Sequence, residues 1–83
     1  MKFSLVYTRR AIRDIEALDA LARKRLGRQI QALEEDPVGK SKKLLNSKLG
    51  TYRFRIGDYR VIFDVHGSQV IILRVGHRRE IYR

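Results

Sequence analysis

The chain has 83 residues, and a chain of this length is expected to form a single domain, residues 1–83, with a thin hydrophobic core. It contains no cysteine, which excludes a disulfide scaffold and a cysteine-based metal site and suits a reducing cytoplasm. It carries 19 Lys or Arg against 9 Asp or Glu, a net charge of +10, and has no apolar run near the roughly 20 residues of a membrane helix. We therefore expect a cytoplasmic protein with a polyanionic partner and no contact with a membrane.

The positive charge is concentrated in the second half of the chain. Residues 1–39 hold eight basic and six acidic side chains, a net charge of +2, whereas residues 40–83 hold eleven and three, a net charge of +8. Such an uneven field favours nucleic acid, the commonest polyanionic partner. The alternative, that the basic composition only aids solubility, stays open.

The first elements expected are a strand over residues 3–7 and a helix that Thr8 caps. Apolar residues recur after Thr8 at helical spacing, while the residues between them are charged. These apolar positions are Ala11, Ile12, Ile15 and Leu18.

A second amphipathic helix is expected from Ala20, with Asp19 as a cap or turn residue and Pro37 as its stop. Its apolar positions are Ala22, Leu26, Ile30 and Leu33. We predict an antiparallel hairpin of two helices, with one unbroken helix across residues 18–22 as the alternative. Residues 38–49 are lysine-rich and predict a loop, with or without one helical turn.

The remainder of the chain has the composition and period of strands. Three β-rich runs, Thr51–Ile56, Tyr59–Val65 and Gln69–Val75, are separated by turn residues at 57–58 and 66–68. The order is therefore β-α-α-β-β-β, followed by a short tail over residues 76–83. We predict an α+β fold in which the helical hairpin covers one face of a twisted, mostly antiparallel sheet.

Side-chain alternation predicts a cluster of arginines on the other face of this sheet. Arg53 and Arg55 share one face of their strand, because successive side chains of a strand point to opposite sides. A two-residue loop at 57–58 would place Arg55 directly opposite Arg60. Like charges in such a pair destabilise a sheet, but planar guanidinium groups suit phosphate oxygens. We call Arg53, Arg55 and Arg60 the arginine face and expect it to bind phosphate rather than merely solvent.

The sequence leaves two features undecided, the side of the sheet on which Arg74 lies and the role of the C-terminal tail. Arg74 would share the arginine face if the second turn had three residues, and would lie on the other face if it had two. The tail, GHRREIYR over residues 76–83, combines three arginines with a histidine and a tyrosine. A tyrosine can stack on a base or move a proton, and a histidine can contact phosphate or act as a base, although each can also be a packing or turn residue.

Two segments together resemble the RelE/ParE toxin superfamily, in particular its RelE branch. They are YRFRIGDYRVIFDV at residues 52–65 and VGHRREIY at residues 75–82, and the resemblance extends over essentially the whole chain. RelE proteins bind in the ribosomal A site and cut the codon there without a metal ion or other cofactor. In that reaction a 2′-hydroxyl attacks the adjacent phosphate, leaving a 2′,3′-cyclic phosphate and a 5′-hydroxyl.

The resemblance also implies which residues act. It implies a catalytic set of Arg53, Arg55, Arg60, Arg78 and Tyr82. It is consistent with further RNA contacts at Lys48, Arg74, His77, Arg79 and Arg83. Some relatives have lysine where this chain has Arg53 and Arg55, and arginine stays protonated at any usable pH, so these two positions are poor candidates for a general base.

A toxin of this family implies an antitoxin. The charge of the second half predicts an acidic, RelB-like partner that folds on binding and covers the arginine face or displaces the tail. The other partners implied are messenger RNA in the A site and ribosomal RNA. Two different functions remain possible for such a chain: a ParE-like inhibitor of DNA gyrase, and an RNA-binding module without catalysis.

Overall fold

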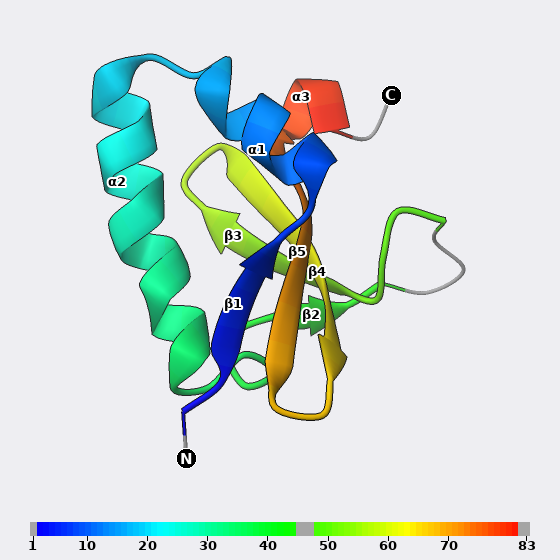
Figure 1. The fold of residues 1–83 in the computed structure, drawn as a ribbon. Coiled ribbons are helices and arrows are strands. Elements are labelled where there is room, and N and C mark those ends of the chain that lie inside the picture. Colours follow the sequence, from blue (N-terminus) through cyan, green and yellow to red (C-terminus); the bar gives the residue numbers. More distant parts are fainter. Residues whose placement is uncertain (1, 45–47, 82–83) are drawn as a thin grey trace.

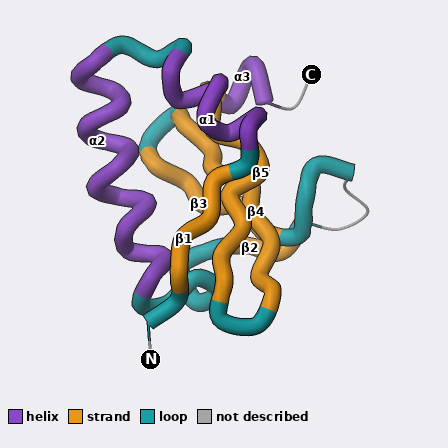
Figure 2. The backbone as a smooth tube through the Cα atoms, viewed as in Figure 1, coloured by secondary structure: helices purple, strands orange, loops and turns teal. Residues whose placement is uncertain are grey.

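The computed structural model describes residues 2–44 and 48–81, and in them helices cover one face of a five-stranded sheet (Figures 1 and 2). The strands lie in the order β1-β5-β4-β3-β2. β1 runs parallel to β5 and the other neighbours are antiparallel, so the predicted α+β fold is confirmed. The elements are β1 (Ser4–Tyr7), α1 (Arg9–Glu16), α2 (Ala20–Ile30), the 3-10 turn η1 (Gln31–Glu34), β2 (Lys42–Lys43), β3 (Tyr52–Ile56), β4 (Tyr59–His66), β5 (Gln69–His77) and α3 (Arg78–Ile81).

Both predicted helix starts are confirmed by their caps. The Thr8 hydroxyl accepts a hydrogen bond from the amide of Ala11 at 3.1 Å, and an Asp19 carboxylate oxygen accepts one from Ala22 at 2.8 Å. Each bond satisfies an amide that has no partner within its own helix. The cap at Asp19 separates α1 from α2, so the alternative of one unbroken helix is wrong.

The predicted meander is confirmed, including its first turn. Arg55 pairs with Arg60 and Ile56 with Tyr59, so residues 57–58 form the two-residue loop. Gly57 has a φ of +59°, a left-handed conformation that glycine adopts without the cost of a β-carbon. Phe54 and Ile56 consequently point into the core.

The second turn is a two-residue loop followed by a β-bulge. His66 pairs with Gln69, which leaves only residues 67–68 in the turn. Farther along, Ile62 pairs with Arg74 while Phe63 pairs with Ile72, so Leu73 is the extra residue on β5. The bulge brings Arg74 onto the same side as Arg60, which a two-residue turn alone would not do.

Two expected segments differ from the structure. The expected loop over 38–49 contains the short strand β2, whose Lys42 pairs with Arg53. A two-residue strand is too short to show a period, which is why the sequence predicted only a loop. The second helix ends earlier than its apolar pattern suggested, because η1 tightens the chain ahead of Pro37.

The core lies between the helices and the covered face of the sheet. Its largest fully buried side chain is Phe63 of β4, which stacks on Tyr52 of β3 with ring centroids 5.4 Å apart. Leu26 and Ile30 of α2 and Ala11 of α1 reach the same cluster. The sheet that carries the arginines is therefore held rigid from its other side. None of the helices in the described part of the chain is long and apolar enough to cross a bilayer.

Ionisation of Tyr7 of β1 should lower the stability of this fold at alkaline pH. Burial, with a smaller contribution from the charge of Glu34, raises the pKa of Tyr7 above its usual 10.0. The folded state then binds the phenol proton more tightly than the unfolded state does. The stabilisation is complete below about pH 10 and is lost as the pH rises through the higher pKa of the folded state.

We therefore expect Tyr7→Phe to flatten the decline of unfolding free energy at alkaline pH. Urea unfolding of both proteins at about pH 8 and about pH 11 measures this, because every other titrating group is common to the two. Parallel declines in the two proteins would contradict the assignment to Tyr7.

Candidate nucleic-acid interface

Two rows of residues, most of them cations, cross the sheet face that the helices leave uncovered. Residues paired directly across antiparallel strands project from the same face, so the register defines these rows. The first row is Lys42, Arg53, Ile62 and Arg74, and the second is Arg55, Arg60 and Gly76. The predicted arginine face therefore exists in the predicted register, and Lys42, which the sequence predicts in a loop, lies beside it as the pairing partner of Arg53.

The members of the arginine face differ in how open they are. Arg55 is exposed, whereas Arg53 is half-buried and its Nε has no hydrogen-bond partner among the described residues. A desolvated guanidinium nitrogen without a partner is costly for the folded state, and an anion at this position would satisfy it. Arg53 can thus donate a hydrogen bond to a phosphate oxygen that reaches this nitrogen.

Arg60 corrects the expectation of three equally open arginines. Its side chain is buried, with a residue exposure of 4%. Nη1 donates hydrogen bonds to the carbonyl oxygens of Gly57 at 2.9 Å and Tyr59 at 2.8 Å. The alternation placed Arg60 on the right face, but its guanidinium folds back onto its own hairpin and is held there.

Arg78, at the start of α3, contacts the same β3–β4 hairpin. Its amide donates to the carbonyl oxygen of Asp58 at 2.8 Å, and its Nε lies 3.9 Å from Oδ1 of Asp58. The side chain stays half-exposed. The turn at residues 57–58 therefore contacts both Arg60 and Arg78, which are 18 positions apart, and brings two predicted site residues together.

A third arginine at this turn was not predicted. A β-carbon at Gly57 would lie only 3.1 Å from Nη2 of Arg25, so the guanidinium of this α2 residue lies against the turn. In the sequence, Arg25 is one of several charged positions on an amphipathic helix and carries no distinguishing signal. Only the packing of α2 beside the β3–β4 hairpin places it there.

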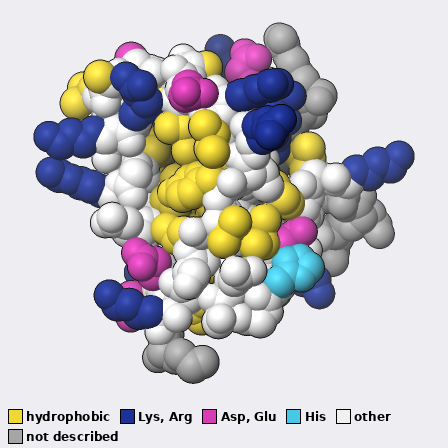
Figure 3. Space-filling model, viewed as in Figure 1, with side chains coloured by type: hydrophobic (Ala, Val, Ile, Leu, Met, Phe, Trp, Pro, Cys, Tyr) yellow, Lys and Arg dark blue, Asp and Glu magenta, His cyan; other side chains and the backbone are white. Residues whose placement is uncertain are grey.

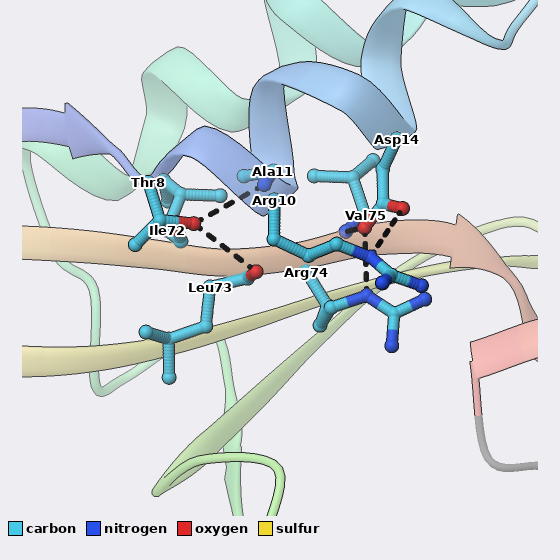
Figure 4. A network of polar contacts seen from close by, with 8 residues as sticks. All are labelled: Thr8, Arg10, Ala11, Asp14, Ile72, Leu73, Arg74 and Val75. Carbon is cyan, nitrogen blue, oxygen red and sulfur yellow. Dashed lines mark hydrogen bonds and ion pairs between the residues drawn. The ribbon is translucent and has the colours of Figure 1, made fainter.

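Arg74 forms an ion pair with a residue of α1. Its Nε donates to Oδ2 of Asp14 at 2.8 Å, and the amide of Val75 donates to the same oxygen at 3.0 Å (Figure 4). The Nε of Arg10 lies 3.4 Å from the other carboxylate oxygen. The Asp14 carboxylate thus accepts a hydrogen bond from the amide of Val75, which lies past the part of β5 that pairs with β1. It also holds the Arg74 side chain close to α1. Arg74 shares the register of the arginine face, but its charge is already paired.

The remaining predicted contacts lie around this centre. His77 pairs with Tyr59 on the helix side of the sheet, and the two rings meet edge to face with centroids 5.8 Å apart. Nδ1 of His77 accepts a hydrogen bond from the amide of Arg79, whose side chain is exposed. Lys48 is exposed, two residues before Gly50, which packs against Ile62 between Arg53 and Arg74. Tyr82 and Arg83 lie outside the described residues.

This arrangement can bind and stabilise negative charge. No group of three or more His, Asp or Glu residues able to hold a metal ion occurs in residues 2–44 and 48–81. The groups that converge on the turn are guanidinium ions, which donate hydrogen bonds and do not accept protons. They suit a phosphodiester whose charge increases in a transition state.

A different kind of surface lies on the helical side. A hollow of about 330 Å³ opens between β1, α1 and α2, and apolar side chains dominate its walls, as the yellow centre of Figure 3 shows. It is lined mainly by Tyr7, Ile12, Ile15, Leu26 and Ile30. Such walls cannot bind phosphate, so the cationic site and the apolar hollow are distinct.

Comparison with known sequences assigns the chain to one group of proteins. The family model of the ParE toxin of type II toxin–antitoxin systems, parDE, matches residues 5–82. Putative toxin RelE1 of Methanocaldococcus jannaschii is 33% identical over 96% of this chain and 93% of its own length. Toxin RelG of Mycobacterium tuberculosis is 40% identical, but the match covers 61% of each protein.

Solved structures show the same similarity in three dimensions. The RelBE2 toxin–antitoxin complex of M. tuberculosis contains a chain that superimposes with a TM-score of 0.85 at 27% identity, covering 94% of this chain and 100% of that one. A chain of the archaeal RelE–RelB complex of Pyrococcus horikoshii OT3 gives 0.76 at 25% identity, covering 96% and 99%.

Proposed function

This chain belongs to the ParE toxin family of type II toxin–antitoxin systems and is a RelE-family toxin, and from that premise we propose that it cleaves messenger RNA in the ribosomal A site. The observation that carries the proposal is the convergence of Arg60 and Arg78 on the turn at residues 57–58, beside the exposed Arg55. A phosphodiester held there would meet the exposed guanidinium groups of Arg55 and Arg78, with the buried Arg60 beneath the turn.

The bonds formed and broken in this reaction balance within the RNA, with no further reactant. The 2′-oxygen of one nucleotide bonds to the adjacent phosphorus while the bond from phosphorus to the 5′-oxygen of the next nucleotide breaks. One proton leaves the 2′-hydroxyl and one is delivered to the departing 5′-oxygen. The products are a 2′,3′-cyclic phosphate and a 5′-hydroxyl, formed without a metal ion.

The site residues divide this work by position. Arg78 contacts the scissile phosphate and stabilises its developing charge, and Arg60 joins it by exchanging its hydrogen bonds to the carbonyl oxygens of Gly57 and Tyr59 for bonds to the phosphate. Arg53 and Arg55 orient the RNA strand, and their charge lowers the pKa of the attacking 2′-hydroxyl. Tyr82 stacks on the target nucleotide or exchanges a proton with it. His77 is a reserve candidate for proton transfer.

The remaining cations contribute to RNA affinity. Lys48 and Arg79 are exposed near the arginine face and the turn, and each can contact a phosphate without entering the reaction. Arg74 can do so only in competition with Asp14, which already holds it. Arg83 completes the set by its place next to Tyr82 in the sequence.

An acidic, RelB-like antitoxin is the second partner we propose, with the toxin acting in the cytoplasm. The solved relatives are described as RelBE2 and RelE–RelB complexes, which supports an antitoxin for this chain as well. The net charge of +10 and the cations of the arginine face favour an acidic segment that covers this face and excludes RNA.

Primer extension on translating ribosomes tests the proposed activity. Adding the protein should produce new 5′ ends within the A-site codon, and the upstream fragment should end in a 2′,3′-cyclic phosphate. Arg60→Ala, Arg78→Ala and Tyr82→Phe proteins should each cleave more slowly. Wild-type rates from all three variants would refute these assignments.

Inhibition of DNA gyrase is the competing function, and the ParE description of the matching family favours it. A gyrase supercoiling assay separates the two. Inhibition of supercoiling by a protein that leaves the messenger intact would establish the gyrase function in place of ribonuclease activity.

A further inference from the structure

The outer side of α2 carries a second cationic surface, separate from the arginine face. Lys24, Arg25 and Arg28 lie one helical turn or less apart and are all exposed. With Leu21 and Gln29 they line a shallow hollow of about 350 Å³. Figure 3 shows Lys and Arg side chains projecting from this side of the molecule, away from the apolar centre. We call Lys24, Arg25 and Arg28 the α2 surface.

No acidic side chain among residues 2–44 and 48–81 neutralises the α2 surface. None of its three cations forms an ion pair with another described residue, and α2 itself contains no Asp or Glu. The helix α1 is different, since its Arg10 pairs with Asp14 one turn later. Like charges one turn apart weaken a helix, so folding alone does not account for this composition.

The α2 surface is continuous with the proposed catalytic site. Arg25 lies against Gly57, and the carbonyl oxygen of Gly57 accepts a hydrogen bond from Arg60. The turn at residues 57–58 therefore contacts Arg25 of α2 as well as Arg60 and Arg78. In Figure 1 this turn points toward α2. A nucleic acid bound at the catalytic site would have a cationic path leading away from it.

We propose that the α2 surface binds the phosphate backbone of ribosomal RNA, while the arginine face binds the messenger. The inference rests on the proposed function and adds a second RNA site to it. Because the arginine face holds the messenger in this proposal, the α2 cations are available to a different RNA segment. Backbone contacts of this kind give affinity and orientation without reading sequence. They would set the angle at which the toxin enters the A site.

Binding to vacant ribosomes, which carry no messenger, tests the α2 surface apart from catalysis. The triple variant Lys24→Gln, Arg25→Gln and Arg28→Gln removes its charge and keeps good helix formers. We expect its dissociation constant to rise about 10- to 100-fold near 0.1 M salt. The plot of log affinity against log salt should become shallower by about two, since each neutralised phosphate contributes roughly 0.7 to 0.9 to the magnitude of its slope.

The matched control removes three charges from other exposed sites, with Arg9→Gln, Arg13→Gln and Lys40→Gln. Its affinity should change less than about threefold, because distant charges act only through the screened overall field. Equal losses from the two triple variants would reduce the effect to net charge and overturn the proposal. Single variants Arg25→Gln and Arg28→Gln, each expected to lose part of the slope, provide the same comparison if the triple variant melts early.

Two further outcomes are decisive. A triple variant that binds ribosomes normally but fails to bind an acidic antitoxin would assign the α2 surface to that protein and overturn the RNA proposal. If the wild-type protein binds vacant ribosomes but leaves messengers intact, the proposed cleavage fails while the comparison of the two variants still decides the α2 surface. Where cleavage occurs, the α2 variant should require a higher ribosome concentration for half-maximal cleavage.

Discussion

Replacing Arg78 by alanine should slow messenger cleavage by about 100- to 1000-fold, the usual effect of removing one donor that stabilises transition-state charge. The change is structurally mild. The side chain is 53% exposed, its contact with Asp58 is long at 3.9 Å, and the backbone bond to Asp58 remains in the variant. The loss should therefore appear in the rate of cleavage by ribosome-bound protein and not in the melting temperature.

Two further variants serve as comparisons for the cleavage rate of Arg78→Ala. Arg78→Lys keeps the charge but loses the planar pair of donors, so we expect a smaller loss, about tenfold. Arg13→Ala removes an exposed arginine from α1 and should cleave at the wild-type rate. Single-turnover primer extension with excess toxin measures all three. A normal rate for Arg78→Ala would remove Arg78 from the site.

The largest effect on stability is expected from Asp14→Ala. This carboxylate, with a side-chain exposure of 13%, accepts hydrogen bonds from Arg74 and from the amide of Val75, as Figure 4 shows. Alanine would leave a guanidinium and a backbone amide without partners in a partly buried place. We expect a loss of about 2 to 3 kcal/mol in unfolding free energy, below the cost of breaking a fully buried ion pair.

Asp14→Asn and Glu16→Ala are the controls for this loss. Asparagine keeps one oxygen acceptor and removes only the charge, so its effect should be intermediate. Glu16 is exposed on the same helix and forms no ion pair with another described residue, so its replacement should change stability by less than about 0.5 kcal/mol. Urea unfolding of the three variants ranks them. An Asp14→Ala protein as stable as Glu16→Ala would show that the network contributes little.

Features that depend on short stretches of chain could be predicted from the order of the residues. Alternation along residues 52–56 put Arg53 and Arg55 on one side, and the two-residue loop then set Arg55 opposite Arg60. Thr8 and Asp19 were recognisable as caps for a similar reason. A cap, a turn and a strand period each involve neighbours within about four positions, so residue order alone is enough to predict them.

Features that depend on how distant segments pack are visible only in the folded chain. The bulge at Leu73 fixed the side of Arg74, and Asp14 of α1 then engaged its charge. Arg60 proved buried because its guanidinium folds onto the hairpin, and Arg25 reached the site because α2 lies beside Gly57. These contacts join elements that are not adjacent in the sequence, and their geometry follows from the packing of the whole core rather than from any local pattern.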